Sequence, residues 1–141
     1  MAEASDCIFC AIAAGTIPSI RVCEDDAAIA FMDINPANPG HCLVISREHA
    51  DNLFQVSPAS LQAVVLMAQK VAHAVWKAMR PDGLNLLQAN GPGAAQSIGH
   101  FHVHVLPRRI DDDLAMNWTL NPGERKALEE TARRIRSALT P

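Results

Sequence analysis

Three histidines alternate with apolar residues in the run His100-Phe101-His102-Val103-His104. Because a β-strand directs alternate side chains to the same face, this pattern predicts a strand with apolar side chains in the core and three imidazoles opposite. Each imidazole carries polar nitrogens that need partners, so a role in packing alone is unfavourable. Two kinds of chemistry fit. Two of the histidines can bind a catalytic zinc ion, or one neutral imidazole can attack phosphorus while its neighbours hold the phosphate oxygens.

The loop that precedes this strand favours phosphorus chemistry. It contains Asn90, Gly91 and Gly93 and is followed by Gln96 and Ser97. Such a loop supplies backbone N–H groups and polar side chains, which are the donors that bind phosphate oxygens.

A Cys-x-x-Cys pair, Cys7 and Cys10, lies near the start of the chain. Three interpretations remain open for it: two ligands of a metal ion, a redox pair, or two small packed side chains. A tetrahedral zinc ion needs two further ligands from elsewhere in the chain. A thioredoxin-like pair is expected after a strand, and no strand pattern precedes Cys7.

Length and composition set the class of protein. The 141 residues suit one domain, and 49% are hydrophobic, enough for a core of ordinary size. Lys and Arg number 12 against 15 Asp and Glu, which argues against binding of a nucleic acid polymer by charge. No run approaches the roughly 18 apolar residues of a membrane span, and no signal peptide is evident. We therefore expect a cytoplasmic protein without membrane contact and with reduced cysteines.

The remaining pattern predicts an antiparallel α+β domain, because its strands are joined mostly by turns. Ser57 and Pro58 mark the start of a long amphipathic helix that ends before Pro81 and Gly83. The expected strands cover residues 21–24, 27–32, 41–45, 84–89 and 101–106, and the expected helices cover residues 57–79 and 121–139.

Residues 100–106 also follow the pattern His-φ-His-φ-His-φ-φ, with φ apolar, and resemble the signature of the histidine triad (HIT) proteins. The resemblance is to the Hint-like branch and covers residues 7–108, whereas the helix after residue 121 looks more like bacterial members. The surrounding motifs stand in the family's order and spacing: Ile8-Phe9-x-x-Ile12, Ile17-Pro18, Glu24-Asp25-Asp26, Ala30-Phe31-Met32-Asp33-Ile34 and His41-Cys42-Leu43-Val44-Ile45.

The resemblance implies a HIT-like antiparallel sheet of about five strands with a long central helix and a C-terminal helix. It implies one domain over residues 1–141, with its core at 7–108 and a helical extension at about 121–139. Members of the family pair as two-fold dimers, so a homodimer is expected.

The implied function is hydrolysis or transfer at the α-phosphate of purine nucleotide conjugates, such as phosphoramidates and adenylated amines. His102 would be the nucleophile and form a nucleotidyl-histidine intermediate, His104 would bind the phosphate, and His41 would support the cluster. Ser97 and Gln96 would contact the phosphate or leaving group, with Asn90 nearby. Asp33 would bind the ribose hydroxyls. The base would lie among Ile8, Phe9, Ile12, Phe31 and Ile34.

The resemblance also implies a structural zinc ion held by Cys7, Cys10, His49 and His100. Three alternatives remain open: a dinucleoside polyphosphate hydrolase, a nucleotide-binding or interaction module without physiological turnover, and a zinc hydrolase with His100 and His102 as ligands. The last would leave the two cysteines unexplained.

Overall fold

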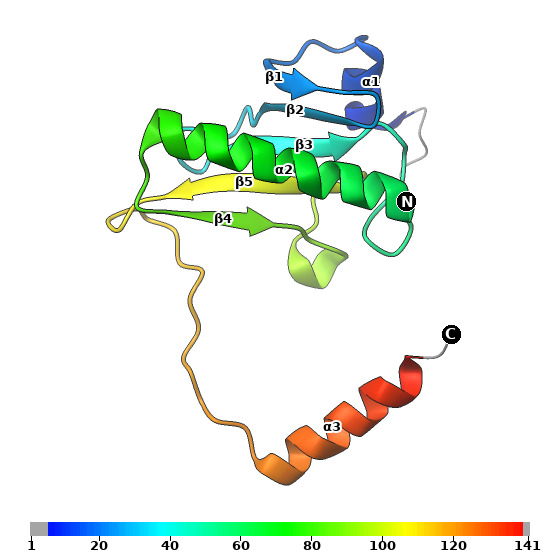
Figure 1. Cartoon of the computed structure of the whole chain (residues 1–141), viewed down its shortest axis with the longest axis vertical. Coiled ribbons are helices and arrows are strands. Elements are labelled where there is room, and N and C mark those ends of the chain that lie inside the picture. Colours follow the sequence, from blue (N-terminus) through cyan, green and yellow to red (C-terminus); the bar gives the residue numbers. More distant parts are fainter. Residues whose placement is uncertain (1–5, 140–141) are drawn as a thin grey trace.

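The computed structural model describes residues 6–139. Within them, five strands form one antiparallel sheet in the order β1-β2-β3-β5-β4 (Figure 1). The elements along the chain are α1 (Ile8–Ala14), β1 (Arg21–Glu24), β2 (Ala28–Met32), β3 (Cys42–Ser46), α2 (Pro58–Met79), β4 (Gly83–Leu87), the short 3₁₀ helix η2 (Pro92–Ala94), β5 (His102–Arg108) and α3 (Arg125–Ala138). The expected α+β class with an antiparallel sheet is confirmed.

Two helices cover opposite faces of the sheet. The long helix α2 runs across one face (Figure 1), where Val64, Val71 and neighbouring apolar residues pack on alternate residues of β2, β3 and β5. On the other face, Phe9 and Ile12 of α1 pack against the intervening residues of β2 and β3. The two-residue period of the strands therefore builds two separate apolar clusters.

The expected strand at residues 21–24 coincides with β1, and the other four differ from the observed strands by one or two residues at their ends, where sequence patterns are least informative. Helix α1 is missing from the expectation. It has only seven residues, too few to show an amphipathic period. Its start is capped by the Cys7 sulfur, which accepts from the Cys10 N–H group, and it ends at Gly15 with a φ of 79°.

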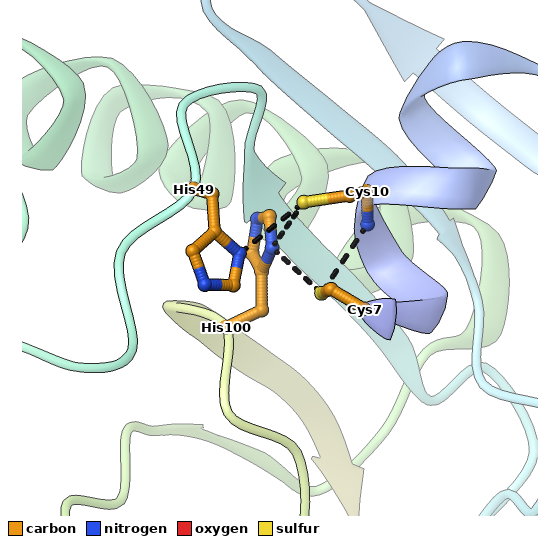
Figure 2. A group of neighbouring side chains, drawn as sticks. All are labelled: Cys7, Cys10, His49 and His100. Carbon is orange, nitrogen blue, oxygen red and sulfur yellow. Dashed lines mark hydrogen bonds between the residues drawn. The ribbon is translucent and has the colours of Figure 1, made fainter. Parts of the chain in front are cut away.

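The expected row of three histidines on one strand also needs a correction. Strand β5 begins at His102, so His100 precedes it and turns towards the cysteines (Figure 2). Only His102 and His104 share a face of the strand.

Helix α3 lies apart from the sheet (Figure 1), joined to β5 by residues 109–124. Glu124 caps its start, and none of its residues is buried. Its apolar side chains are exposed as well, with Leu128 at 59% and Ile135 at 58%. Among the described residues, no helix is long and apolar enough to cross a bilayer.

Candidate active site and metal centre

His102 opens β5 and is almost fully buried beside Phe9, whose ring meets the imidazole edge-on with 5.2 Å between centroids. Its Nδ1 lies 2.6 Å from the carbonyl oxygen of His100. A carbonyl only accepts, so Nδ1 carries the proton and Nε2 keeps its lone pair. Burial lowers the pKa of His102, which keeps the ring neutral near pH 7. The geometry thus presents one unprotonated nitrogen.

A chain of hydrogen bonds sets the proton positions of the two neighbouring histidines. The Ala37 N–H group donates to His41 Nδ1 at 3.0 Å, so neutral His41 carries its proton on Nε2. That Nε2 donates to His104 Nδ1 at 2.9 Å. His104 must then hold its own proton on Nε2, where it is available as a donor.

Burial decides the charge of this chain. Burial, together with His102 and His41, lowers the pKa of His104 to about 4. Burial also lowers the pKa of His41, although the Asp33 carboxylate opposes that shift. Both rings are therefore neutral near pH 7, as the chain of donors and acceptors requires.

Asp33 follows β2 and has two contacts inside the protein. Its Oδ1 accepts from the Asn35 N–H group at 2.8 Å, which holds the turn after the strand. Its Oδ2 lies 3.4 Å from His41 Nε2. A carboxylate oxygen has more than one lone pair, so this position remains able to accept from a ligand.

His102, His104 and Asp33 line a cavity of about 490 Å³. Most of its lining is apolar, and its other polar residues are Ser19, Asn35 and Ser97, which is the usual make-up of a small-molecule site. All five residues expected around the base are included. The full lining is Ile8, Phe9, Ile12, Ile17, Pro18, Ser19, Phe31, Met32, Asp33, Ile34, Asn35, Leu43, Ser97, Ile98, His102 and His104.

Three expected site residues lie beside the cavity instead of lining it, as far as residues 6–139 show: His41, Asn90 and Gln96. The Asn90 carboxamide exchanges hydrogen bonds with the Gln88 side chain and accepts from the Leu53 N–H group. The Gln96 carboxamide is also bonded within the protein. Their contacts support the loop between β4 and β5.

Side chains from three distant parts of the sequence meet at a second site, shown in Figure 2: Cys7, Cys10, His49 and His100. His100 Nδ1 lies 3.2 Å from the Cys7 sulfur and 3.5 Å from the Cys10 sulfur. His49 Nδ1 lies 3.2 Å from the Cys10 sulfur. Sulfur and nitrogen ligands of one tetrahedral zinc ion are about 3.6 Å apart. The cluster therefore needs little adjustment to hold such an ion.

The proton positions of His49 and His100 also suit the binding of a metal ion. His100 Nε2 donates to the Ser46 carbonyl oxygen at 2.6 Å, and His49 Nε2 lies 3.3 Å from the Asp51 carboxylate. Both rings therefore turn an unprotonated Nδ1 towards the sulfurs, as metal-binding histidines do. Burial and the nearby Cys7 sulfur raise the pKa of Cys10 to about 11. A bound cation would reverse that shift by stabilising the thiolates.

Asp33, His41 and His104 form another compact group of possible ligands, within 4.8 Å of one another. Here the proton positions are unfavourable for a metal. An ion on His41 Nε2 would force the proton onto Nδ1, against the N–H group of Ala37 that points at it. The group is a hydrogen-bonded chain, and distance alone does not distinguish it from a metal site.

Several contributors to these sites were not expected from the sequence, and two of them are Asp51 and the Ala37 N–H group. Asp51 stands two residues after His49. Metal-binding histidines often donate to a carboxylate, so this short spacing could have indicated Asp51 as the partner of His49. The Ala37 N–H group acts through its backbone and leaves no signal in the residue type.

Comparison with known proteins agrees with this geometry. The HIT domain model matches residues 14–111. Adenosine 5′-monophosphoramidase hnt1 of Schizosaccharomyces pombe is 38% identical over 128 residues, which are 88% of this chain and 93% of the relative.

Two solved structures extend the comparison. A HIT family protein from Bacillus subtilis has a TM-score of 0.90 at 34% identity, covering 96% of this chain and 99% of the other. A zinc-bound histidine triad family protein from Mycobacterium smegmatis has a TM-score of 0.75 at 31% identity, covering 96% and 99%. The chain belongs to the HIT family.

Proposed function

We propose that this protein hydrolyses or transfers the nucleoside monophosphate part of purine nucleotide conjugates, with phosphoramidates and adenylated amines as substrates. The observation that carries the proposal is the fixed tautomer of His102. Its Nδ1 proton is bound to a carbonyl, so its Nε2 lone pair is free beside the cavity. A neutral imidazole in this state is a nucleophile that needs no prior deprotonation.

In the first step, His102 Nε2 attacks the α-phosphorus, and the bond from phosphorus to the leaving amine breaks. The amine leaves with the electron pair of that bond and gains a proton. Water then displaces His102, which yields the nucleoside monophosphate and restores the neutral ring. The Nε2–H group of His104 donates to a phosphate oxygen throughout, and His41 acts through His104 by holding its tautomer. Ser97 contacts the leaving group.

The rest of the cavity suits a nucleoside. Asp33 accepts from the ribose hydroxyls, and the base lies among the apolar side chains Ile8, Phe9, Ile12, Phe31 and Ile34. Asn90 and Gln96 do not line the cavity, and they act by holding the loop between β4 and β5. The S. pombe relative, named as an adenosine monophosphoramidase, supports an adenosine substrate.

We further propose that Cys7, Cys10, His49 and His100 hold a structural zinc ion. The donor set leaves no ligand position for water or substrate, which is typical of structural sites. The zinc-bound relative from M. smegmatis supports this assignment. Thiolate ligands require reducing conditions, so we place the protein in the cytoplasm.

A homodimer is also proposed, built on the outer surface of α2 and the free edge of β4. Three large apolar side chains of α2 are exposed there, Val65, Leu66 and Trp76. Strand β4 ends the sheet and leaves an unpaired edge. Light scattering should give twice the chain mass, and Leu66→Glu should give a monomer. A monomeric wild type would refute the dimer.

The reaction is tested with adenosine 5′-phosphoramidate and with a diadenosine polyphosphate. Wild type should release adenosine monophosphate, His102→Asn should not, and His73→Asn, at an exposed histidine outside both clusters, should retain activity. Faster turnover of the diadenosine compound would favour the polyphosphate hydrolase.

Mild chelation separates the proposed mechanism from a zinc hydrolase. Activity that survives it supports attack by His102, whereas loss in step with the metal while the fold persists favours a catalytic zinc ion. A wild type inert towards both nucleotides, despite a native fold, would refute the proposal.

A further inference from the structure

The Gln96 carboxamide holds three backbone groups of its surroundings. Its Oε1 accepts from the Gly91 N–H group at 2.8 Å, and its Nε2 donates to the carbonyl oxygens of Asp51 at 2.6 Å and Ile98 at 3.0 Å. Ser97 lines the cavity. It lies between Gly91 and Ile98, whose backbone groups this carboxamide binds. The side chain therefore sets the shape of the phosphate loop, here defined as residues 91–98.

Asp51 belongs at the same time to the surroundings of the metal centre. It is 6% exposed, and its carboxylate lies 3.3 Å from His49 Nε2. The preceding residue, Ala50, accepts from the Phe101 N–H group at 2.7 Å, next to His100. Residues 49–51 are therefore attached to both histidine ligands of the cluster.

These contacts form a continuous path from the metal ligands to the phosphate loop. Without a metal ion, His49 is held to Cys10 by a single weak contact of nitrogen with sulfur. With an ion bound, its position is fixed by a coordinate bond, and the Asp51 backbone is fixed with it.

We infer that Asp51 and Gln96 are positioning residues that couple occupancy of the Cys7–Cys10–His49–His100 centre to the order of the phosphate loop. The inference rests on the proposed zinc site and extends it, because the metal then also controls the order of the phosphate loop. If the order of the phosphate loop sets the affinity for nucleotide, the coupling is reciprocal. The factor by which zinc raises the affinity for nucleotide then equals the factor by which nucleotide raises the affinity for zinc.

Hydrogen exchange of the Gly91 amide tests this without any activity measurement. In the zinc-loaded protein the amide should be protected, and removal of zinc should speed its exchange about tenfold or more while the amides of α2 stay protected. Unchanged Gly91 exchange would overturn the inference. Loss of protection throughout α2 would also overturn it, because the metal would then act on the whole fold.

Gln96→Glu provides a second arm, in which the exchange of the Gly91 amide is measured in the zinc-loaded and in the zinc-free protein. The substitution keeps the acceptor for Gly91 but replaces the donor to Asp51 with an oxygen. Zinc should then change Gly91 exchange by less than about twofold, whereas Asn117→Asp, an exposed amide-to-acid control in the segment between β5 and α3, should behave as wild type. Full zinc dependence in Gln96→Glu would overturn the inference. Zinc-dependent exchange in a wild type that turns over no nucleotide would refute the proposed reaction alone.

Discussion

Gly40 offers a sharp test of the packing next to the hydrogen-bonded chain of His41 and His104, because its position combines a backbone and a steric constraint. Its φ is 95°, and a Cβ at this position would lie 2.9 Å from Met79 Cγ and 3.2 Å from Pro107 Cγ. Neither neighbour is the free end of a side chain, so the Met79 rotamer or the backbone must move. Gly40 also immediately precedes His41, which fixes the tautomer of His104.

The expected cost of Gly40→Ala follows from three contributions. A positive φ costs a non-glycine residue about 1–2 kcal/mol, and overpacking costs about 1–3 kcal/mol. The lower entropy of the unfolded chain returns about 0.4–1 kcal/mol. The free energy of unfolding should therefore fall by about 1–5 kcal/mol.

Gly15→Ala is the matched control. Its φ is 79°, and within residues 6–139 no heavy atom other than those of its chain neighbours lies within 4 Å of the added Cβ. It should lose only about 0–1.5 kcal/mol, from backbone strain less the entropic gain. Urea unfolding of both variants and of wild type measures the difference directly. Equal losses in the two variants would refute the steric part of the argument, and a stabilised Gly40→Ala would refute all of it.

Three further outcomes are expected. Ser19→Ala should raise the free energy of unfolding by about 1 kcal/mol in thermal scans, because the Ser19 hydroxyl is buried without a partner among residues 6–139. Glu48→Gln should be less stable than wild type at pH 7, because hydroxyls at the start of α2 hold the pKa of Glu48 below its ordinary value of 4.5. The difference in stability should vanish as the pH falls below 4.5 and Glu48 becomes protonated in the folded protein. A pH-independent difference in denaturant titrations would contradict this. Metal analysis should find about one zinc ion per chain in wild type and in His41→Ala but none in Cys7→Ser, and a second ion lost with His41 would show that the hydrogen-bonded chain binds metal.

Local pattern determined much of the architecture from the sequence alone. The alternation in residues 101–105 predicts which side chains enter the core, and Phe101, just before β5, packs with Val103 and Val105 in the cluster beneath α2. The start of α2 follows from Ser57 and Pro58, whose capping and backbone preferences are local. The resemblance to the HIT family placed the cavity residues in one site, because its motifs cover most of the chain.

The proton positions of the histidines were decided only by the tertiary structure. The residue type does not specify which ring nitrogen carries the proton, because that depends on partners brought together by folding. His100 donates to Ser46, 54 residues away, and becomes a possible metal ligand. His41 accepts from the Ala37 amide and becomes part of a proton-donating chain. Two clusters of possible metal ligands with similar spacing thus differ in their proton positions, because different hydrogen-bond partners fix the protons of their histidines.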